Sequence, residues 1–281
     1  MREIDACGVG FVADAHGRAS RAIVDAALGA LVNLKHRGAV AADARTSDGT
    51  GVLLPIPAAI FAHHGVAQLF VHGADPRQAI EVLAHAEGLD VVGWREPPTD
   101  DATLGELARL SRPGLLQALL SARDDAADTD AERRAYRLRR RIEREVPECS
   151  VVSCSFATIP YKGLSAGDQF AAHWLDLADP DVTAPFVVFN QRFSTNTLPS
   201  WERAQPFRLS AHNGEINSLA ANVARMQARG PLGTEAAGLG PEAWYRPLFG
   251  AHDSDSQMLD ETLELLLRAG RTLPHALAMC I

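Results

Sequence analysis

Cys7 is the first residue of the chain whose side chain could act as a strong nucleophile. It follows a polar lead of six residues in the opening MREIDACGVGF and directly precedes an apolar segment. A secretory signal needs a basic start and a long apolar core, whereas acidic residues occupy that part of this lead. Residues 1–6 are therefore interpreted either as the frayed end of a first strand or as a short pro-segment whose removal would make Cys7 the first residue.

A cysteine at a free N-terminus carries both groups that amide hydrolysis requires. The α-amine has a pKa of roughly 7.7 to 8.0 and the thiol one of about 8.5, so the amine can act as the base that activates the thiol. A separate histidine is then unnecessary, and nothing in the sequence selects one of the 10 histidines as a partner. The alternative is that Cys7, beside Val9 and Phe11, is a small buried apolar side chain.

Arg192 is a candidate for binding a carboxylate. It belongs to the motif QRFSTNT (191–197), at the end of a segment that reads as an apolar strand. A guanidinium that emerges at a sheet edge can hold a carboxylate through two parallel hydrogen bonds. A surface salt bridge is the alternative role for this residue.

Asn213 and Gly214 are candidates for stabilising a developing oxyanion. In AHNGEIN (211–217) they are expected to join a strand to a helix, so that the Gly214 N–H is one of the unpaired donors at a helix start. Together with the Asn213 amide it would supply two hydrogen-bond donors to an oxyanion. The alternative is a plain turn, because Asn-Gly is a common turn pair.

Asp253 and Asp255 lie in the motif AHDSDSQ (251–257), just before an expected helix. Helix capping is the simpler role for carboxylates at such a place, and a metal site that includes His252 is the second interpretation. Cys149 and Cys154 stand on a strand pattern, where we expect them to pack rather than to bind an iron–sulfur cluster.

The composition is that of an ordinary globular protein. The chain has 281 residues, of which 47% are hydrophobic and 22% charged, and this predicts one large domain or two small ones. A net charge of -8 provides no basic surface for nucleic acid, and no apolar run of about 18 residues predicts a membrane span. The 4 cysteines are too few and too scattered for a disulfide framework, so a reducing cytoplasm fits best.

The first half of the chain is expected to mix strands and helices. The pattern predicts a strand over 8–13, a helix over 20–36 behind Ser20, and a loop that leads into a strand over 51–56. Residues 74–146 are interpreted as helix, short strand (91–94) and further helices. The last of these, 128–146, has a basic face and is expected to be a solvated surface helix that ends before Pro147.

The second half is richer in strands. Segments 150–163 and 184–196 predict strands, with a helix over 165–178 between them. The expected elements that follow are a strand over 207–211, a helix over 215–230 ended by Gly230, and an apolar helix capped by Ser254 or Ser256. The chain stops at Ile281 within another helical pattern, which we expect further chain to cover.

The order of the motifs resembles one family. The start CGVG, then NLKHRGA, SDGTG, YKGL, RFSTNTLPSWERAQPF, HNGEIN and SDS before an apolar helix are similar to the glutaminase domain of the glutamate synthase large subunit. That domain is a class II glutamine amidotransferase, one of the N-terminal nucleophile hydrolases. The likeness runs from about Cys7 to the chain end, and the block RFSTNTLPSWERAQPF distinguishes glutamate synthase from amidotransferases of the glucosamine-6-phosphate synthase and amidophosphoribosyl types.

The resemblance implies a catalytic role for three of the candidates. Cys7, exposed by removal of residues 1–6, would attack the side-chain amide of glutamine, and its own α-amine would carry the proton. Ammonia would leave and a thioester would remain. Asn213 and Gly214 would form the oxyanion hole in both the acylation and the hydrolysis step.

The resemblance also implies the residues that bind the substrate. Arg192 would hold the α-carboxylate of glutamine, with Thr195 nearby, and Asp255 would hold the α-ammonium. Such a site would reject amides that lack these charges, because buried Arg192 and Asp255 would then be left unpaired. Arg37, in the HRG turn, matches a position that lines the site in the family.

The implied fold is α+β, a four-layer α/β/β/α sandwich of two antiparallel sheets. Residues 7–281 would form the amidotransferase domain, without its C-terminal part, after the pro-segment 1–6. The implied partner is the central, FMN-binding domain or subunit of a glutamate synthase, which would use the ammonia to aminate 2-oxoglutarate. FMN and an iron–sulfur cluster are expected only in those absent synthase domains, and no cofactor is expected in this chain. The second hypothesis is a catalytically inert, truncated glutaminase-like module that acts in binding or assembly.

Overall fold

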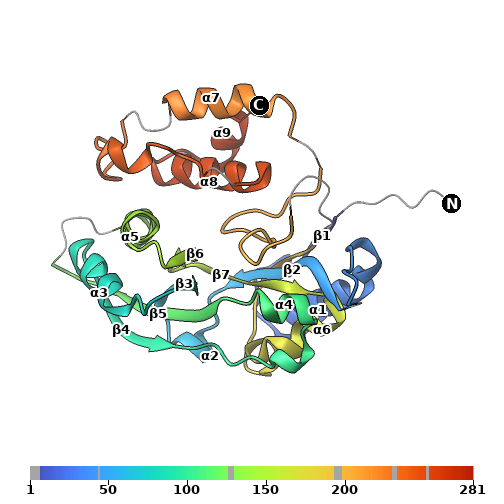
Figure 1. The fold of residues 1–281 in the computed structure, drawn as a ribbon. Helices are drawn as coiled ribbons and strands as arrows, with labels where there is room; N and C mark the ends of the chain where they lie inside the picture. Colours follow the sequence, from blue (N-terminus) through green and yellow to red (C-terminus); the bar gives the residue numbers. More distant parts are fainter. Residues whose placement is uncertain are drawn as a thin grey trace.

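The chain folds around two antiparallel sheets of four strands each in the part that the structure describes (Figure 1). The structure is a computed structural model, and it describes residues 7–43, 45–125, 130–192, 198–214, 216–229, 233–250 and 253–280. The strands of the first sheet, in spatial order, are β1 (Gly8–Ala13), β8 (Phe186–Gln191), β2 (Thr46–Pro55) and β7 (Thr158–Ser165). Those of the second sheet are β4 (Leu89–Arg95), β5 (Gly114–Ala122), β3 (Gly65–Val71) and β6 (Cys149–Ser155).

Helices cover the sheets on their outer sides and form a further layer. The helices that accompany the sheets are α1 (Arg21–Asn33), η1 (Lys35–Arg37), α2 (Ala58–Phe61), α3 (Arg77–Ala86), η2 (Asp101–Thr103), α4 (Glu106–Leu110), α5 (Ala131–Glu145), α6 (Gly167–His173) and η3 (Leu175–Ala178). The further layer, at the top of Figure 1, contains α7 (Leu219–Arg229), η4 (Glu242–Tyr245), α8 (Asp255–Arg268) and α9 (Leu273–Ala278).

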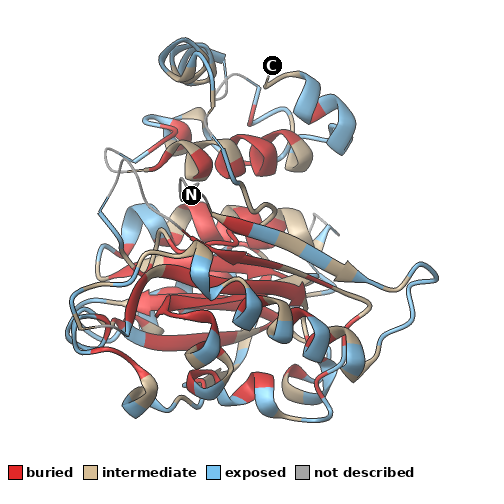
Figure 2. Cartoon of the chain, turned by 90° about the vertical axis from the view of Figure 1, so that its right-hand side faces the viewer, coloured by how far each residue is buried: buried red, intermediate tan, exposed pale blue. Residues whose placement is uncertain are grey.

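The apolar core lies on both faces of the second sheet. Val66 and Phe70 of β3 join a cluster that extends through the first sheet to α1. Ala67 and Leu69 alternate with them and join a second cluster with α3 and α5. Because successive strand residues point to opposite faces, this alternation buries β3 on both sides, as the red strands at the centre of Figure 2 show.

The expected α+β class, with two antiparallel sheets and outer helices, is confirmed. Several elements also fall where the pattern predicted them: β1 spans Gly8–Ala13, and α1 begins directly after Ser20. None of the helices in the described ranges is both long and apolar enough to cross a membrane.

Two interpretations of the first half are wrong. Residues 114–122, read as helical, form strand β5; their sequence GLLQALLSA is apolar on both faces, and such a run does not distinguish a buried strand from a helix. Strand β2 begins at Thr46, inside the expected loop. Its polar start is tolerated in the sheet because hydroxyl groups find partners there, as when Ser47 Oγ donates to the Ser165 carbonyl over 2.6 Å.

The basic helix α5 is not the solvated surface helix that its composition indicates. Arg139 is 0% exposed, and its guanidinium lies 2.9 Å from a Glu261 carboxylate oxygen and 3.1 Å from one of Glu264. Both acids belong to α8, more than a hundred positions away in the sequence. Buried charges require such partners, so the basic face serves to join α5 to the upper helical layer.

Candidate active site

Cys7 lies at one end of the first sheet, directly before strand β1 begins. Gly8 pairs with Gln191 in the antiparallel ladder between β1 and β8. Cys7 precedes Gly8 and Arg192 follows Gln191, so the two residues lie at the same end of the two strands. Cys7 is half-buried, and its sulfur is not in a disulfide bond. The β-ladder therefore brings the expected nucleophile beside the expected carboxylate-binding residue.

Arg192 is buried rather than exposed at the sheet edge, with 6% of its surface accessible. Its backbone N–H donates to the Gly49 carbonyl over 2.7 Å, and its Nη1 lies 3.4 Å from the Asp48 carbonyl. Burial lowers the pKa of the guanidinium, while Asp48, Cys7 and Asp255 favour its charged form. Arg192 is thus within electrostatic range of both Cys7 and Asp255.

Gly49 allows another segment to approach the site closely. Its φ is +135°, and a Cβ there would lie 2.9 Å from the Cβ and 3.0 Å from the Cα of Ala204. A side chain at this position would be strained and would also collide with backbone. Glycine is therefore required where the 198–207 segment crosses the start of β2.

Asn213 reaches the nucleophile across 206 positions of sequence. Its side-chain Nδ2 donates a hydrogen bond of 2.6 Å to the backbone carbonyl of Cys7. Gly214 follows with φ +145°, a conformation that side chains rarely adopt. Both residues are exposed. Asn213 is thus placed beside Cys7, and Gly214 directly follows it in the chain.

The expectation that Asn213 and Gly214 join a strand directly to a helix is wrong. Helix α7 begins at Leu219, so the Gly214 N–H is not among the unpaired donors of a helix start. The expected strand over 207–211 is absent as well, and these residues form a turn in which the Phe207 N–H donates to the Ser210 carbonyl over 2.9 Å. A short irregular segment, held by side chains from elsewhere, presents the Asn-Gly pair.

Asp255 is the first residue of α8 and is half-buried. Ser254 is the N-cap: its side chain accepts from the Gln257 N–H, and the Gln257 side chain accepts from the Ser254 N–H. One of the two capping residues predicted is therefore confirmed. Since Ser254 caps the helix, the Asp255 carboxylate does not serve as the N-cap.

A polar chain links Asp255 to the segment that carries Asn213. Ser256 Oγ donates to Asp255 Oδ1 over 3.1 Å and lies 3.3 Å from Nδ1 of His212. The sequence interpretation missed His212 and considered Ser256 only as a cap. His212 and Ser256 stand next to Asn213 and Asp255 in the two motifs, and these positions could have indicated their place in the site.

Arg37 lies at the end of the short helix η1 and is half-buried. A Cβ on the next residue, Gly38, would lie 2.3 Å from Nε2 of Gln191. The HRG turn therefore packs against the residue that precedes Arg192, which places Arg37 at the edge of the site. Thr195, His252 and residues 1–6 lie outside the described residues.

The other buried thiols are unsuited to nucleophilic chemistry. Burial raises the pKa of the Cys149 thiol to about 11 and raises that of Cys154 further. The prediction that these two cysteines pack within the fold is confirmed, since both are buried and free. Within the described ranges, no group of three or more His, Cys, Asp or Glu residues is arranged to hold a metal ion.

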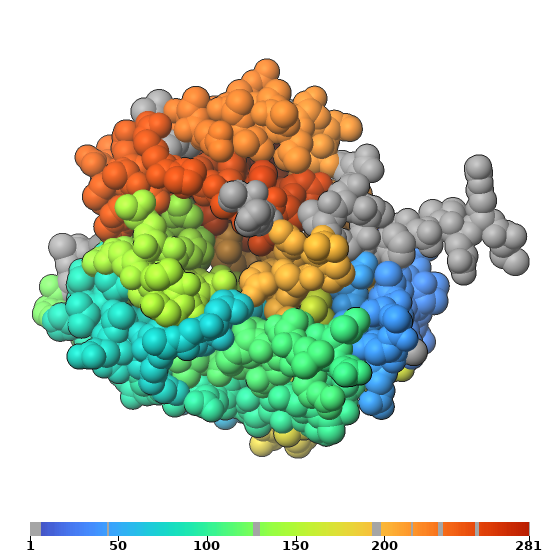
Figure 3. Space-filling model, viewed as in Figure 1, coloured from blue at the N-terminus to red at the C-terminus, as the bar shows by residue number. Residues whose placement is uncertain are grey.

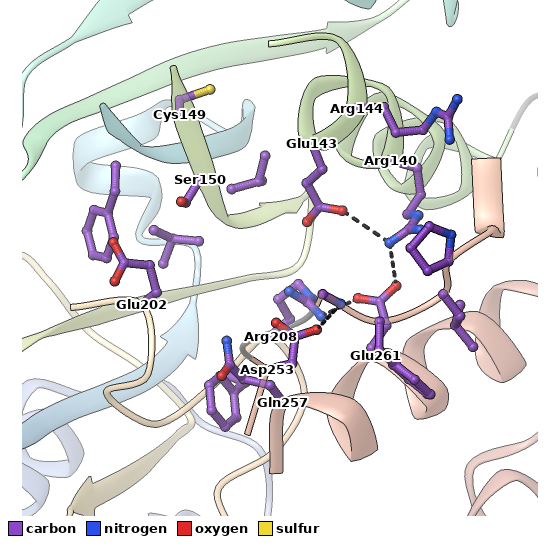
Figure 4. A pocket seen from close by; sticks show the side chains of 18 of the residues that line it. Arg140, Glu143, Arg144, Cys149, Ser150, Glu202, Arg208, Asp253, Gln257 and Glu261 are labelled. Carbon is purple, nitrogen blue, oxygen red and sulfur yellow. Dashed lines mark hydrogen bonds and ion pairs between the residues drawn. The ribbon is translucent and has the colours of Figure 1, made fainter. Parts of the chain in front are cut away.

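A cavity of about 530 Å³ lies apart from Cys7, between α5, β6 and the start of α8 (Figure 4). Figure 3 shows the surface hollowed where α5, the 200–214 segment and α8 meet. The cavity is lined by Lys162 of β7, whose Nζ donates to the Glu202 carbonyl over 2.7 Å. Burial lowers the pKa of Lys162 to about 7. None of the seven site residues expected from the sequence is among the described residues that line this cavity.

Comparison with known proteins gives a consistent family. The family model described as glutamine amidotransferases class-II matches residues 7–281. The chain is 34% identical to the glutamate synthase [NADPH] large chain of Azospirillum brasilense, over 99% of this chain and 20% of that protein. It is 36% identical to ferredoxin-dependent glutamate synthase 1 of Arabidopsis thaliana, over 100% of this chain and 19% of that protein. It is also 36% identical to ferredoxin-dependent glutamate synthase 2 of Synechocystis, over 97% of this chain and 19% of that protein. The chain spans about a fifth of the length of these relatives.

Proposed function

The chain belongs to the class II glutamine amidotransferases, and on this premise we propose that it hydrolyses the side-chain amide of L-glutamine to glutamate and ammonia. The Cys7 thiol attacks the amide carbon, and the α-amine of the same residue takes the thiol proton and passes it to the departing ammonia. Water then hydrolyses the thioester, with the amine acting as base. Both steps pass through a negatively charged oxygen.

The observation that carries this proposal is the contact between Asn213 and Cys7. A side-chain amide nitrogen has two N–H donors, so Asn213 Nδ2 can keep one on the Cys7 carbonyl, 2.6 Å away, and direct the other to the oxyanion. Gly214, with its positive φ, supplies the second donor in this proposal. Donors fixed in this way stabilise the transition state because they need no reorganisation when charge develops.

Arg192 and Asp255 select an amino acid by both of its charged ends. A guanidinium binds a carboxylate through two parallel hydrogen bonds, and Arg192 is already desolvated, so the contact is strong. Asp255 binds the α-ammonium in this proposal, and Thr195 and Arg37 contribute to the same pocket. A substrate without these charges would lose the contact with the buried guanidinium of Arg192, at a cost in binding free energy of about 1 to 3 kcal/mol, and would also lose the contact with half-buried Asp255.

The ammonia would pass to a synthase partner. The relatives of this chain are glutamate synthase chains about five times its length, which supports a partner domain or subunit that aminates 2-oxoglutarate to glutamate. FMN and an iron–sulfur cluster would belong to that partner. We infer a reducing cytoplasm as the compartment, because a thiol nucleophile must remain reduced.

Ammonia release by the purified chain tests this function. We expect L-glutamine to yield ammonia, and Cys7→Ala to abolish the release. Cys280→Ala is the matched control, since Cys280 is also a half-buried cysteine outside any disulfide, and it should retain the wild-type rate. Unchanged release by Cys7→Ala would mean that another group performs the chemistry, and a folded chain that releases no ammonia would support the inert binding module instead.

A further inference from the structure

Residues 207–214 form the segment that presents Asn213 and Gly214, and it is called the oxyanion arm below. No helix or strand includes these residues, so the backbone hydrogen bonds of regular structure do not fix the arm. A buried carboxylate does so instead. Asp260, on helix α8, is 0% exposed and points at the beginning of the arm.

Three consecutive backbone N–H groups of the arm converge on Asp260. Its Oδ1 accepts from the N–H of Leu209 over 2.9 Å and of Ser210 over 3.0 Å, and its Oδ2 accepts from the N–H of Arg208 over 3.2 Å. The Ser210 hydroxyl adds a fourth bond of 2.9 Å to Oδ1. Hydrogen bonds to an ionised acceptor are roughly twice as strong as neutral ones. We propose that Asp260 is a positioning residue for the oxyanion hole, an inference that rests on the function proposed above.

Arg208 supplies a positive charge beside this buried carboxylate. Its Nη2 lies 3.3 Å from Asp260 Oδ2, and the same guanidinium pairs with Glu261 over 2.7 Å and Glu264 over 2.6 Å. Figure 4 shows Arg208 pointing toward Glu261 on α8. Burial alone would lower the pKa of Arg208, but these three acids raise it above its ordinary value. The arm is therefore fastened to α8 through both its backbone and its first charged side chain.

Helix α8 holds two parts of the proposed site at once. Asp255 and Asp260 are five residues apart on it, about 7.5 Å along the helix axis. A second link joins the arm to its surroundings, because the His212 N–H donates to Gln205 Oε1 over 2.7 Å. With the arm fixed at 208–210 and again at His212, Asn213 has little freedom to leave Cys7. A misplacement of about 1 Å at a catalytic group can cost 10²-fold in rate.

Asp260→Asn is the variant that tests this inference. An amide offers one oxygen in place of two and directs an N–H₂ group toward donors, so the bonds to Leu209 and Ser210 cannot coexist with those to Arg208. We expect kcat for glutamine hydrolysis to fall by about 10- to 100-fold, with KM changed by less than about threefold, because the charged ends of glutamine are bound elsewhere. Ser210→Ala removes only the hydroxyl bond, and we expect a smaller fall in kcat, of about three- to tenfold.

Glu264→Gln is the matched control. Glu264 is as deeply buried as Asp260 and pairs with the same Arg208, but no backbone N–H of the arm donates to it in the described contacts. It should lose stability without a comparable loss of kcat. A merely structural role for Asp260 would instead give Asp260→Asn and Glu264→Gln the same ratio of kcat loss to stability loss.

Hydrogen–deuterium exchange on the full chain separates this inference from the proposed function. Asp260→Asn should speed exchange in peptides that cover 207–214 and leave those of β1 and β8 unchanged. Unchanged exchange in 207–214 would overturn the positioning role whether or not the protein releases ammonia. If Asp260→Asn does not fold, Ser210→Ala is the variant to measure. A wild-type kcat and wild-type exchange in the arm of Ser210→Ala would also overturn the positioning role of Asp260. If the wild-type protein releases no ammonia but Asp260→Asn still speeds exchange in 207–214, the proposed function is refuted and the positioning role of Asp260 stands.

Discussion

The two halves of the proposed site are held by different kinds of interaction. Cys7 and Arg192 sit at the end of a β-ladder in which six consecutive residues of β1 pair with β8, over an apolar core shared by both sheets. Asn213 and Asp255 come from the irregular arm and from a helix start, and buried charges join that layer to the sandwich. Backbone ladders tolerate side-chain changes, whereas an ion cluster depends on each partner. The nucleophile side is therefore fixed by the fold, and the oxyanion side by a few specific side chains.

The contrast extends to burial. Helix α7, which follows the arm, has no buried residue among those described, and Asn213 itself is exposed. In the sandwich, Val66 and Phe70 are 0% exposed. Elements with little buried apolar surface open at lower free energy than a core. We therefore expect the arm and α7 to open at lower free energy than the sandwich does.

The largest effect is expected on the oxyanion side, from Asn213→Ala. Loss of one oxyanion donor typically lowers kcat by about 10²- to 10³-fold, and KM should change little because the donor acts in the transition state. Asn222→Ala, on exposed α7, is the control and should be near wild type. Steady-state kinetics of ammonia release measures both. A rise in KM at constant kcat would place Asn213 in ground-state binding and break the proposed division of roles.

A smaller effect is expected on the nucleophile side, from Arg192→Lys. Lysine keeps the charge but loses the two parallel hydrogen bonds to a carboxylate, so KM for glutamine should rise by about 10- to 100-fold, with kcat reduced less. Arg21→Lys is the control, since Arg21 binds the carbonyls of Asp179 and Leu177 at the outer surface. Equal KM values for Arg192→Lys and wild type would remove Arg192 from substrate binding.

The last effect is on stability rather than on kinetics, and it concerns the boundary between the two halves, where Lys162 of β7 donates to the Glu202 carbonyl of the overlying segment. Burial, followed by Arg208, lowers the pKa of Lys162 to about 7 from an ordinary value of 10.5. Between these two pH values the unfolded chain binds the extra proton, so the free energy of unfolding should rise with pH across this window, by up to about 1.4 kcal/mol per pH unit. The full penalty applies below about pH 7.

Lys162→Met should flatten that rise, because it removes the titrating amine. Urea unfolding at intervals from pH 7 to pH 10 measures the difference. The same slope in wild type and Lys162→Met would show that this lysine is not the group responsible.

The sequence predicts the elements on the nucleophile side well because local pattern decides them. Residues 8–13 are a short apolar run, and Ser20 precedes a helix with apolar residues at helical spacing. The run was expected to be buried, but Val9 and Phe11 are exposed in β1. The apolar run of β5 misled the prediction, since period alone does not separate a fully buried strand from a helix. Residue types and motif order supplied the candidate site residues.

The oxyanion side could not be derived from local pattern. The basic face of α5 reads as solvated until acids from α8 are known to meet it. Likewise, Arg208, Leu209 and Ser210 resemble the start of a strand, but the Asp260 carboxylate organises them into a turn. These partners lie about 50 or more positions apart, and a single sequence does not pair them.

The most direct test of the account is the mass of the mature protein after reaction with a diazoketone analogue of glutamine. We predict a chain that begins at Cys7, without residues 1–6, and that carries the analogue on the thiol of that residue. In such a chain the same residue both attacks the amide and moves the proton. A folded, purified protein that retains residues 1–6 and leaves Cys7 unlabelled would contradict the account, because its amine would remain locked in a peptide bond.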